Sequence, residues 1–175
     1  AKNRVAETVD RLADELERIS HQIHAHPELC FEEHKASAWL ADFLAKQGAA
    51  VERGVGGLPT AFRATIAGQG PGPTIAIMAE YDALPNIGHA CGHNVIATAG
   101  TGAGAAIAAA LAPLPSPGRI QVIGTPAEEG GAGKVRLMEA GVFEDVDAAM
   151  MIHGRCGTQV WRPSLGIIKV KCEFF

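Results

Sequence analysis

The hydrophobic period of the sequence changes near Gly48, and this change constrains the fold more than any other feature. Before Gly48, apolar residues recur at intervals of three and four, which places them on one side of a helix. Helices are therefore predicted over residues 5–23 and 31–46. After Gly48, short apolar runs predict strands over residues 60–66, 74–81, 119–124 and 148–152. Further helices are predicted over residues 94–111, with Asn94 as the N-cap, and 134–140.

Strands that alternate with helices predict an α/β fold: a three-layer α/β/α sandwich, with a mixed, mostly parallel sheet and helices on both faces. The 175 residues, 47% of them hydrophobic, are enough for one real core. Residues 1–165 are expected to belong to one domain. The alternation of residues 166–175 predicts an apolar strand that ends the chain without a turn, and therefore the truncated start of a second unit.

Composition excludes several classes of function. The net charge of −4 and the scattered basic residues give no basis for nucleic-acid binding. The longest apolar stretch, residues 95–114, is broken by threonines and ended by prolines, so no membrane span is predicted. The four cysteines, at positions 30, 91, 156 and 172, show no paired spacing, which is typical of a reduced cytoplasmic protein.

Potential metal ligands follow the carboxyl ends of predicted strands, where open α/β sheets place their functional groups. They are Glu80, Asp82, Cys91, His93, Glu128, Glu129 and His153. Each alone has a structural explanation: a cysteine and histidine beside a glycine turn, a solvated acidic pair, a core histidine. Together they form a mixed set of thiolate, imidazole and carboxylate that suits Zn²⁺ or a similar ion. Two adjacent carboxylates, Glu128 and Glu129, suit a division of labour between metal binding and proton transfer.

Four motifs resemble the M20 family of metallopeptidases and amidohydrolases, in the order and spacing of that family. They are residues 79–85 (AEYDALP), 88–94 (GHACGHN), 125–133 (TPAEEGGAG) and 152–154 (IHG). The stretch HAHPEL at residues 24–29 resembles the N-terminal motif of the same family. The resemblance is greatest to the branch that hydrolyses N-acyl-amino acids, aminobenzoyl-glutamate and β-alanyl dipeptides.

The resemblance implies a role for individual residues. Cys91 is implied to bridge two divalent metal ions, with His93, Glu129 and His153 as further ligands. Glu128 is implied to be the general base, and Asp82 to orient a ligand. Related metallopeptidases carry a histidine where this sequence has Glu80, so no role is carried over to Glu80, and none to His89.

The resemblance also implies properties of the whole protein. Residues 1–165 would be the N-terminal part of a catalytic domain, and the strand from Gly166 would lead into a lid and dimerisation domain. A final histidine ligand and the groups that hold the substrate's carboxylate would lie beyond Phe175. The complete protein is then expected to be a homodimeric hydrolase of small amide or dipeptide substrates, using Zn²⁺, Mn²⁺ or Co²⁺. The isolated chain is expected to hold metal incompletely and to turn over substrate poorly or not at all.

Two alternatives remain open. The first is a non-catalytic binding or assembly module that keeps the same fold. The second is a nucleotide-binding oxidoreductase, suggested by the glycines between Gly100 and Gly104. These glycines lie inside a predicted helix and not at a strand-to-helix turn, which disfavours the second alternative.

Overall fold

A computed structural model describes residues 2–112 and 115–158 of the chain. The predicted second unit at residues 166–175 and the predicted end of the first at residue 165 lie outside the described residues. In chain order the elements are α1 (Lys2–Ala25), α2 (His34–Lys46), β1 (Ala50–Arg53), the 3-10 helix η1 (Val55–Gly57), β2 (Phe62–Ala67), β3 (Thr74–Ala79), α3 (His93–Leu111), β4 (Arg119–Gly124), α4 (Glu128–Gly131), α5 (Gly133–Glu139) and β5 (Ala148–Met150).

The five described strands form one mixed sheet in the order β1-β2-β4-β3-β5. β3 pairs in parallel with both β4 and β5, whereas β2 pairs antiparallel with β1 and β4. Because β3, β4 and β5 run in the same direction, their carboxyl ends meet at one edge of the sheet. The loops that leave these ends carry the candidate functional residues.

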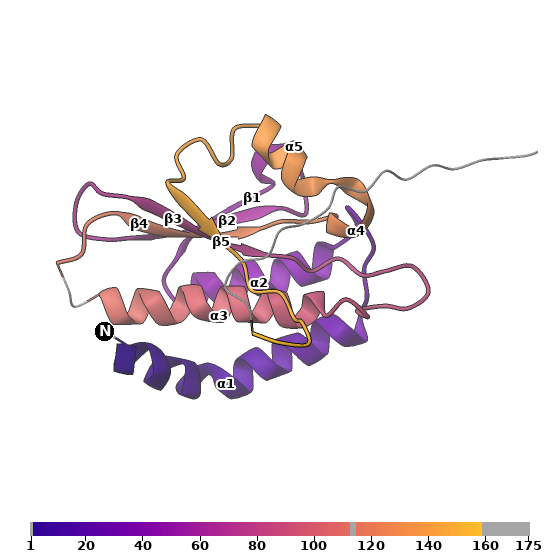
Figure 1. Cartoon of the computed structure of the whole chain (residues 1–175), viewed down its shortest axis with the longest axis horizontal. Helices are drawn as coiled ribbons and strands as arrows, with labels where there is room; N and C mark the ends of the chain where they lie inside the picture. Colours follow the sequence, from indigo (N-terminus) through magenta and orange to yellow (C-terminus); the bar gives the residue numbers. More distant parts are fainter. Residues whose placement is uncertain (1, 113–114, 159–175) are drawn as a thin grey trace, which may run out of the picture.

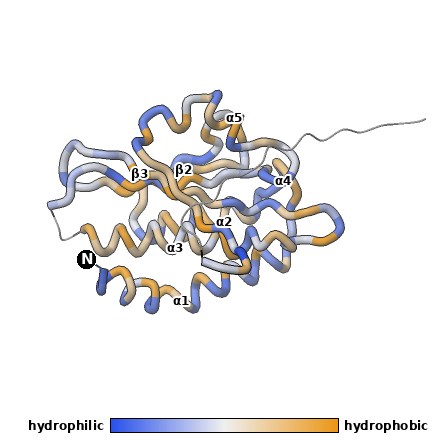
Figure 2. Tube along the Cα trace, viewed as in Figure 1, coloured by the Kyte–Doolittle hydropathy of each residue, from blue (hydrophilic) through white to orange (hydrophobic). Residues whose placement is uncertain are grey.

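Helices cover both faces of the sheet, as predicted. Figure 1 shows α1, α2 and α3 on one face and α5 on the other. The larger core cluster lies on the three-helix side and joins residues of α1 and α2, such as Ile23 and Leu40, to Phe62 of β2 and Val122 of β4. A smaller cluster under α5 is built around Leu137 and Ile123. In Figure 2, hydrophilic and hydrophobic residues alternate along α1, as expected for a helix with one face on the core.

Small residues bring α3 close to the sheet. A Cβ atom at Gly104 would lie 2.3 Å from Cγ2 of Val122, and one at Gly100 would lie 3.0 Å from the carbonyl oxygen of Met78. The glycine run is therefore a packing feature inside a helix. By length and hydropathy α3 is the one helix in the described part that could cross a membrane, but 61% of its apolar window is buried in the protein. A buried core helix passes the same compositional test.

Some local predictions differ from the structure. The short strand β1 and the turn η1 were not predicted, because four residues with largely exposed side chains carry no clear apolar pattern. Asn94 is not the cap of α3: the helix begins at His93 after Gly92, whose φ is 83°. The amide of Asn94 instead donates to Oγ of Ser20 at 3.0 Å, which ties α3 to α1.

Candidate metal centre

His93 is the fixed point of the candidate site. Its side chain is fully buried at the first residue of α3. Nδ1 of His93 lies 2.9 Å from the carbonyl oxygen of Asp82 and 3.0 Å from Oδ1 of the same residue. Both partners are oxygen acceptors, so Nδ1 carries the hydrogen and donates it. The lone pair of the neutral ring is therefore on Nε2, the nitrogen that faces the site.

Three carboxylates surround Nε2 of His93. The nearest oxygens are Oε2 of Glu80 at 3.4 Å, Oε1 of Glu129 at 3.7 Å and Oε2 of Glu128 at 3.9 Å. Nε2 of His93 and Oε2 of Glu80 are buried and have no hydrogen-bond partner among the described residues. A lone pair that faces several anionic oxygens is repelled by them unless a metal ion lies between or the ring takes up a proton at Nε2.

Asp82 joins three parts of the site. Its Oδ1 accepts the hydrogen bond from His93, and its Oδ2 accepts one from the backbone N–H of Glu129 at 2.8 Å. The thiol of Cys30 lies 3.6 Å from the same Oδ2. Burial alone would raise the pKa of Asp82, but the hydrogen bonds from His93 and Glu129 outweigh it and lower the pKa. Asp82 is thus held ionised as an orienting group for His93.

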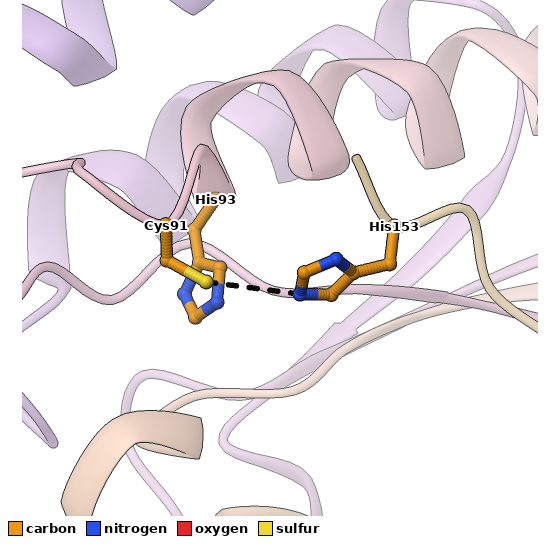
Figure 3. A group of neighbouring side chains, drawn as sticks. All are labelled: Cys91, His93 and His153. Carbon is orange, nitrogen blue, oxygen red and sulfur yellow. Dashed lines mark hydrogen bonds between the residues drawn. The ribbon is translucent and has the colours of Figure 1, made fainter. Parts of the chain in front are cut away.

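Cys91 and His153 add a thiol and a second imidazole. Figure 3 shows both beside His93, with His153 reaching the site from the segment after β5. Sγ of Cys91 lies 3.7 Å from Nε2 of His153, and the rings of His93 and His153 are 6.4 Å apart. Burial and the neighbouring carboxylates, Glu129 first among them, raise the pKa of Cys91 to about 11. The thiol would need a bound cation to lose its proton near neutral pH.

Glu128 and Glu129 are presented by the short helix α4. Ala127 and Ala132 flank it with φ values of 57° and 50°, in the left-handed region. The turn is held from below by Glu33, a fully buried residue whose Oε1 accepts the N–H of Ala127 at 2.8 Å. Burial raises the pKa of Glu128, and the nearby charge of Glu80 raises it further. A raised pKa suits a carboxylate that takes up and delivers protons.

The structure therefore brings together all six predicted site residues. Two overlapping groups have ligand atoms within 4.8 Å of one another: Cys91 with His93 and His153, and His93 with Glu128 and Glu129. Two ligands bound tetrahedrally at about 2.1 Å from one ion would be about 3.4 Å apart, close to the separations found here. Donor types, buried atoms without partners and spacing all fit a divalent metal centre.

Sequence reasoning missed three residues that shape the site. Glu33 supports the turn before α4, Cys30 contacts Asp82, and Lys134 pairs with Glu80. Glu33 and Cys30 lie far from their partners in the sequence, and nothing local to them indicates these contacts. Lys134 could have been noticed only as a basic residue close in sequence to the Glu128-Glu129 motif.

These features define a class of protein: an α/β fold with a candidate metal centre of sulfur, nitrogen and carboxylate ligands at the carboxyl ends of its parallel strands. Residues 76–172 match the model of "Peptidase family M20/M25/M40". The chain belongs to this family, as its motifs predicted.

Relatives with assigned activities also match the chain in sequence. The chain is 41% identical over 184 residues to the Xaa-Arg dipeptidase of Mus musculus, covering 99% of this chain and 43% of that protein. It is 40% identical over 152 residues to one of the subunits of the p-aminobenzoyl-glutamate hydrolase of Escherichia coli, covering 77% of this chain and 31% of that protein. The chain therefore spans less than half the length of these relatives.

Solved structures share the fold. A dinuclear metal-binding M20 peptidase from Bacillus subtilis superimposes with a TM-score of 0.75 at 30% identity, over 83% of this chain and 44% of that one. An aminobenzoyl-glutamate utilization protein from Klebsiella pneumoniae gives a TM-score of 0.69 at 26% identity, over 83% and 45%.

Proposed function

We propose that the complete protein containing this chain is a metal-dependent hydrolase of amide bonds in dipeptide-like or N-acyl-amino acid substrates. The observation that carries the proposal is the environment of His93. Its buried Nε2 has no hydrogen-bond partner among the described residues and lies 3.4 to 3.9 Å from oxygens of three carboxylates, while Asp82 fixes the opposite nitrogen. The dipeptidase and hydrolase relatives support the same chemistry.

We assign the metal ligands to Cys91, His93, Glu129 and His153. Two divalent ions, the nuclearity of the Bacillus subtilis relative, would need a shared ligand, and the motif resemblance implies Cys91 for that role. Zn²⁺ is the ion that this mixture suits best, and Mn²⁺ or Co²⁺ are compatible with it. Bound ions would polarise the scissile carbonyl and lower the pKa of the attacking water. Asp82 keeps Nδ1 of His93 protonated, so the ring presents Nε2 in the orientation needed for binding.

Glu128 is the proposed general base. Its side chain is 43% exposed, far more than that of Glu129 at 19%, so it can reach both the site and an incoming substrate. In the ionised form its carboxylate would take a proton from the attacking water, and in the protonated form it would deliver that proton to the leaving amine. The adjacent positions of Glu128 and Glu129 on the short helix α4 support a base that is held next to a ligand without a flexible linker.

The relatives suggest the order in which substrates should be tried. Dipeptides with a C-terminal arginine come first, then p-aminobenzoyl-glutamate, then N-acyl-amino acids. The complete protein would be stripped of metal with a chelator, reloaded with Zn²⁺, Mn²⁺ or Co²⁺, and assayed on this panel. Activity that disappears on stripping and returns on reloading is expected. A chelator-resistant activity would contradict the proposal.

The variant Glu128→Gln separates the base from the ligands. We expect it to lose activity about 10²- to 10⁴-fold while it retains the metal content of the wild type. Glu139→Gln, a substitution of an exposed glutamate on α5, is the matched control and should leave activity unchanged. Hydrolysis at the wild-type rate by Glu128→Gln would show that the base is another residue.

A further inference from the structure

A partly buried ion pair borders the candidate metal centre and includes none of its proposed ligands. Glu80 follows β3 and is 2% exposed. Its Oε1 pairs with Nζ of Lys134, which comes from the first turn of α5, just after α4 in the chain. Among the described residues, no other lysine pairs with a carboxylate side chain that is less than one-tenth exposed.

The two oxygens of Glu80 have different environments. Oε1 is neutralised by Lys134, whereas Oε2 has no hydrogen-bond partner among the described residues and is the carboxylate oxygen nearest to Nε2 of His93, at 3.4 Å. A buried carboxylate is stable only when a cation or several hydrogen bonds compensate it. In the absence of metal, Lys134 provides the compensating charge for Glu80.

The charges of Glu80 and Lys134 also reach other residues of the candidate site. Glu80 raises the pKa values of Glu128, Cys91 and His93, and Lys134 lowers the pKa of Glu128. The side chain of Lys134 is 27% exposed, so its ammonium group can turn toward solvent at moderate cost when another cation arrives. A divalent ion at His93 would meet the negative Oε2 of Glu80 and, farther off, the positive charge of Lys134.

We propose that Lys134 is a tethered counter-ion of the metal centre, which stabilises the metal-free site through Glu80 and competes with the divalent ion for it, while Glu80 raises the affinity for that ion. This proposal rests on the proposed metal-dependent function. It assigns the two residues opposite effects on metal binding: Glu80 strengthens it and Lys134 weakens it.

These two opposite effects can be tested by measuring metal affinity in competition with a chromophoric chelator. Glu80→Gln keeps the size of the side chain and removes its charge, and we expect an affinity for Zn²⁺ about 10- to 100-fold lower. Lys134→Met removes a positive charge beside the site, and we expect an affinity about tenfold higher together with a lower melting temperature of the metal-free protein. Lys134→Arg retains the charge and should resemble the wild type in both respects.

Lys46→Met is the matched control, because Lys46 is 68% exposed and pairs with Glu15 on the helical face of the protein. It should change neither quantity. If Lys134→Met does not fold without metal, it can be purified loaded, and its rate of Zn²⁺ loss to excess chelator compared with that of the wild type. Slower loss supports the proposal.

Unchanged or weaker binding by Lys134→Met, or unchanged binding by Glu80→Gln, would overturn the counter-ion role. Failure of the underlying function gives a different result. In that case the wild-type protein itself would bind no divalent ion, and Cys91→Ala and His93→Ala would match it in metal content.

Discussion

The candidate site has two halves that differ in burial. One half, formed by His93, Asp82 and Glu80, has side chains that are 0 to 2% exposed and are fixed by hydrogen bonds or an ion pair. The other half is open: the side chain of Glu128 is 43% exposed, His153 is exposed and Cys91 is half-buried. The two halves meet at Nε2 of His93.

The difference in burial separates side chains whose positions the fold determines from side chains whose positions a bound metal ion would complete. The buried half sits where the end of β3 meets the start of α3, and both elements are packed into the core. Its geometry is therefore set before any ion binds. The open half is carried by a loop, a four-residue helix and the segment after β5. We expect substitutions in the buried half to affect stability and substitutions in the open half to affect binding and catalysis.

The largest expected contrast is between Asp82→Ala and changes in the open half. Asp82→Ala removes the carboxylate that accepts from the ring of His93 and from the N–H of Glu129, and leaves Nδ1 of His93 only the backbone carbonyl oxygen of residue 82. We expect the free energy of unfolding of the metal-free protein to fall by about 3 kcal/mol, as for other broken buried pairs. Urea denaturation in the presence of a chelator measures this.

Cys91→Ala and His153→Ala are the comparison variants. Both side chains are partly or wholly exposed, so their removal should change the free energy of unfolding by no more than about 0.5 kcal/mol, although metal binding is lost. A destabilisation by His153→Ala equal to that by Asp82→Ala would show that the two halves are not distinct.

A smaller effect is expected from a substitution that reaches the buried half through packing. At Gly104 an added Cβ would come within 2.3 Å of Cγ2 of Val122, so Gly104→Ala must push α3 away from β4. Overpacking of this kind costs about 1–3 kcal/mol. Because His93 starts the same helix, metal affinity should fall as well.

Gly154→Ala provides the control in the open half. No atom lies within 4 Å of a Cβ built at this position, next to His153. Thermal unfolding and metal titration should both match the wild type. Equal losses in the two glycine variants would mean that α3 does not position His93.

The sequence predicted the residues of the site better than the contacts that support them. Metal-ligand residue types that follow strand ends indicated Cys91, His93, Glu129 and His153 without any coordinates, because parallel strands end at one edge of a sheet. The supports of the site were not visible in this way. Glu33 acts on Ala127 and Lys134 on Glu80 through contacts between distant segments, which depend on how β3, α4 and the loop before α2 pack together.

Capping was the weakest part of the local prediction. Asn94 has the residue type of an N-cap, but a glycine with positive φ starts α3 and the asparagine side chain binds Ser20. Tertiary contact thus replaced the local signal. The strand-helix order and the stop at Gly48, with φ of 89°, were confirmed, since both depend on hydrophobic pattern and on backbone conformation that glycine alone adopts easily.

The smallest expected effect is a pH dependence that belongs to the buried half alone. Burial lowers the pKa of His93, but the hydrogen bond to Asp82 and the charge of Glu80 outweigh it, so the pKa lies above its ordinary 6.5. A raised pKa means that the protonated ring stabilises the metal-free fold below pH 6.5, and that this contribution is lost as pH rises through the folded-state pKa. The melting temperature with chelator should therefore fall by about 2–4 °C between about pH 6 and 8.5.

The variant His93→Asn should lack this alkaline decline. Asp82, whose pKa is lowered, contributes stability that is lost only as pH falls below 3.8, outside this range, and the thiol of Cys91 titrates at about 11. With metal bound the trend should reverse, because the ion competes with protons for Nε2 and binds more tightly as pH rises. An identical slope in wild type and His93→Asn would assign the decline to another group, and the carboxyl groups with raised pKa values, Glu128 and Glu33, would be the candidates. His89 would not explain it, because burial lowers its pKa and its contribution to stability therefore grows as pH rises.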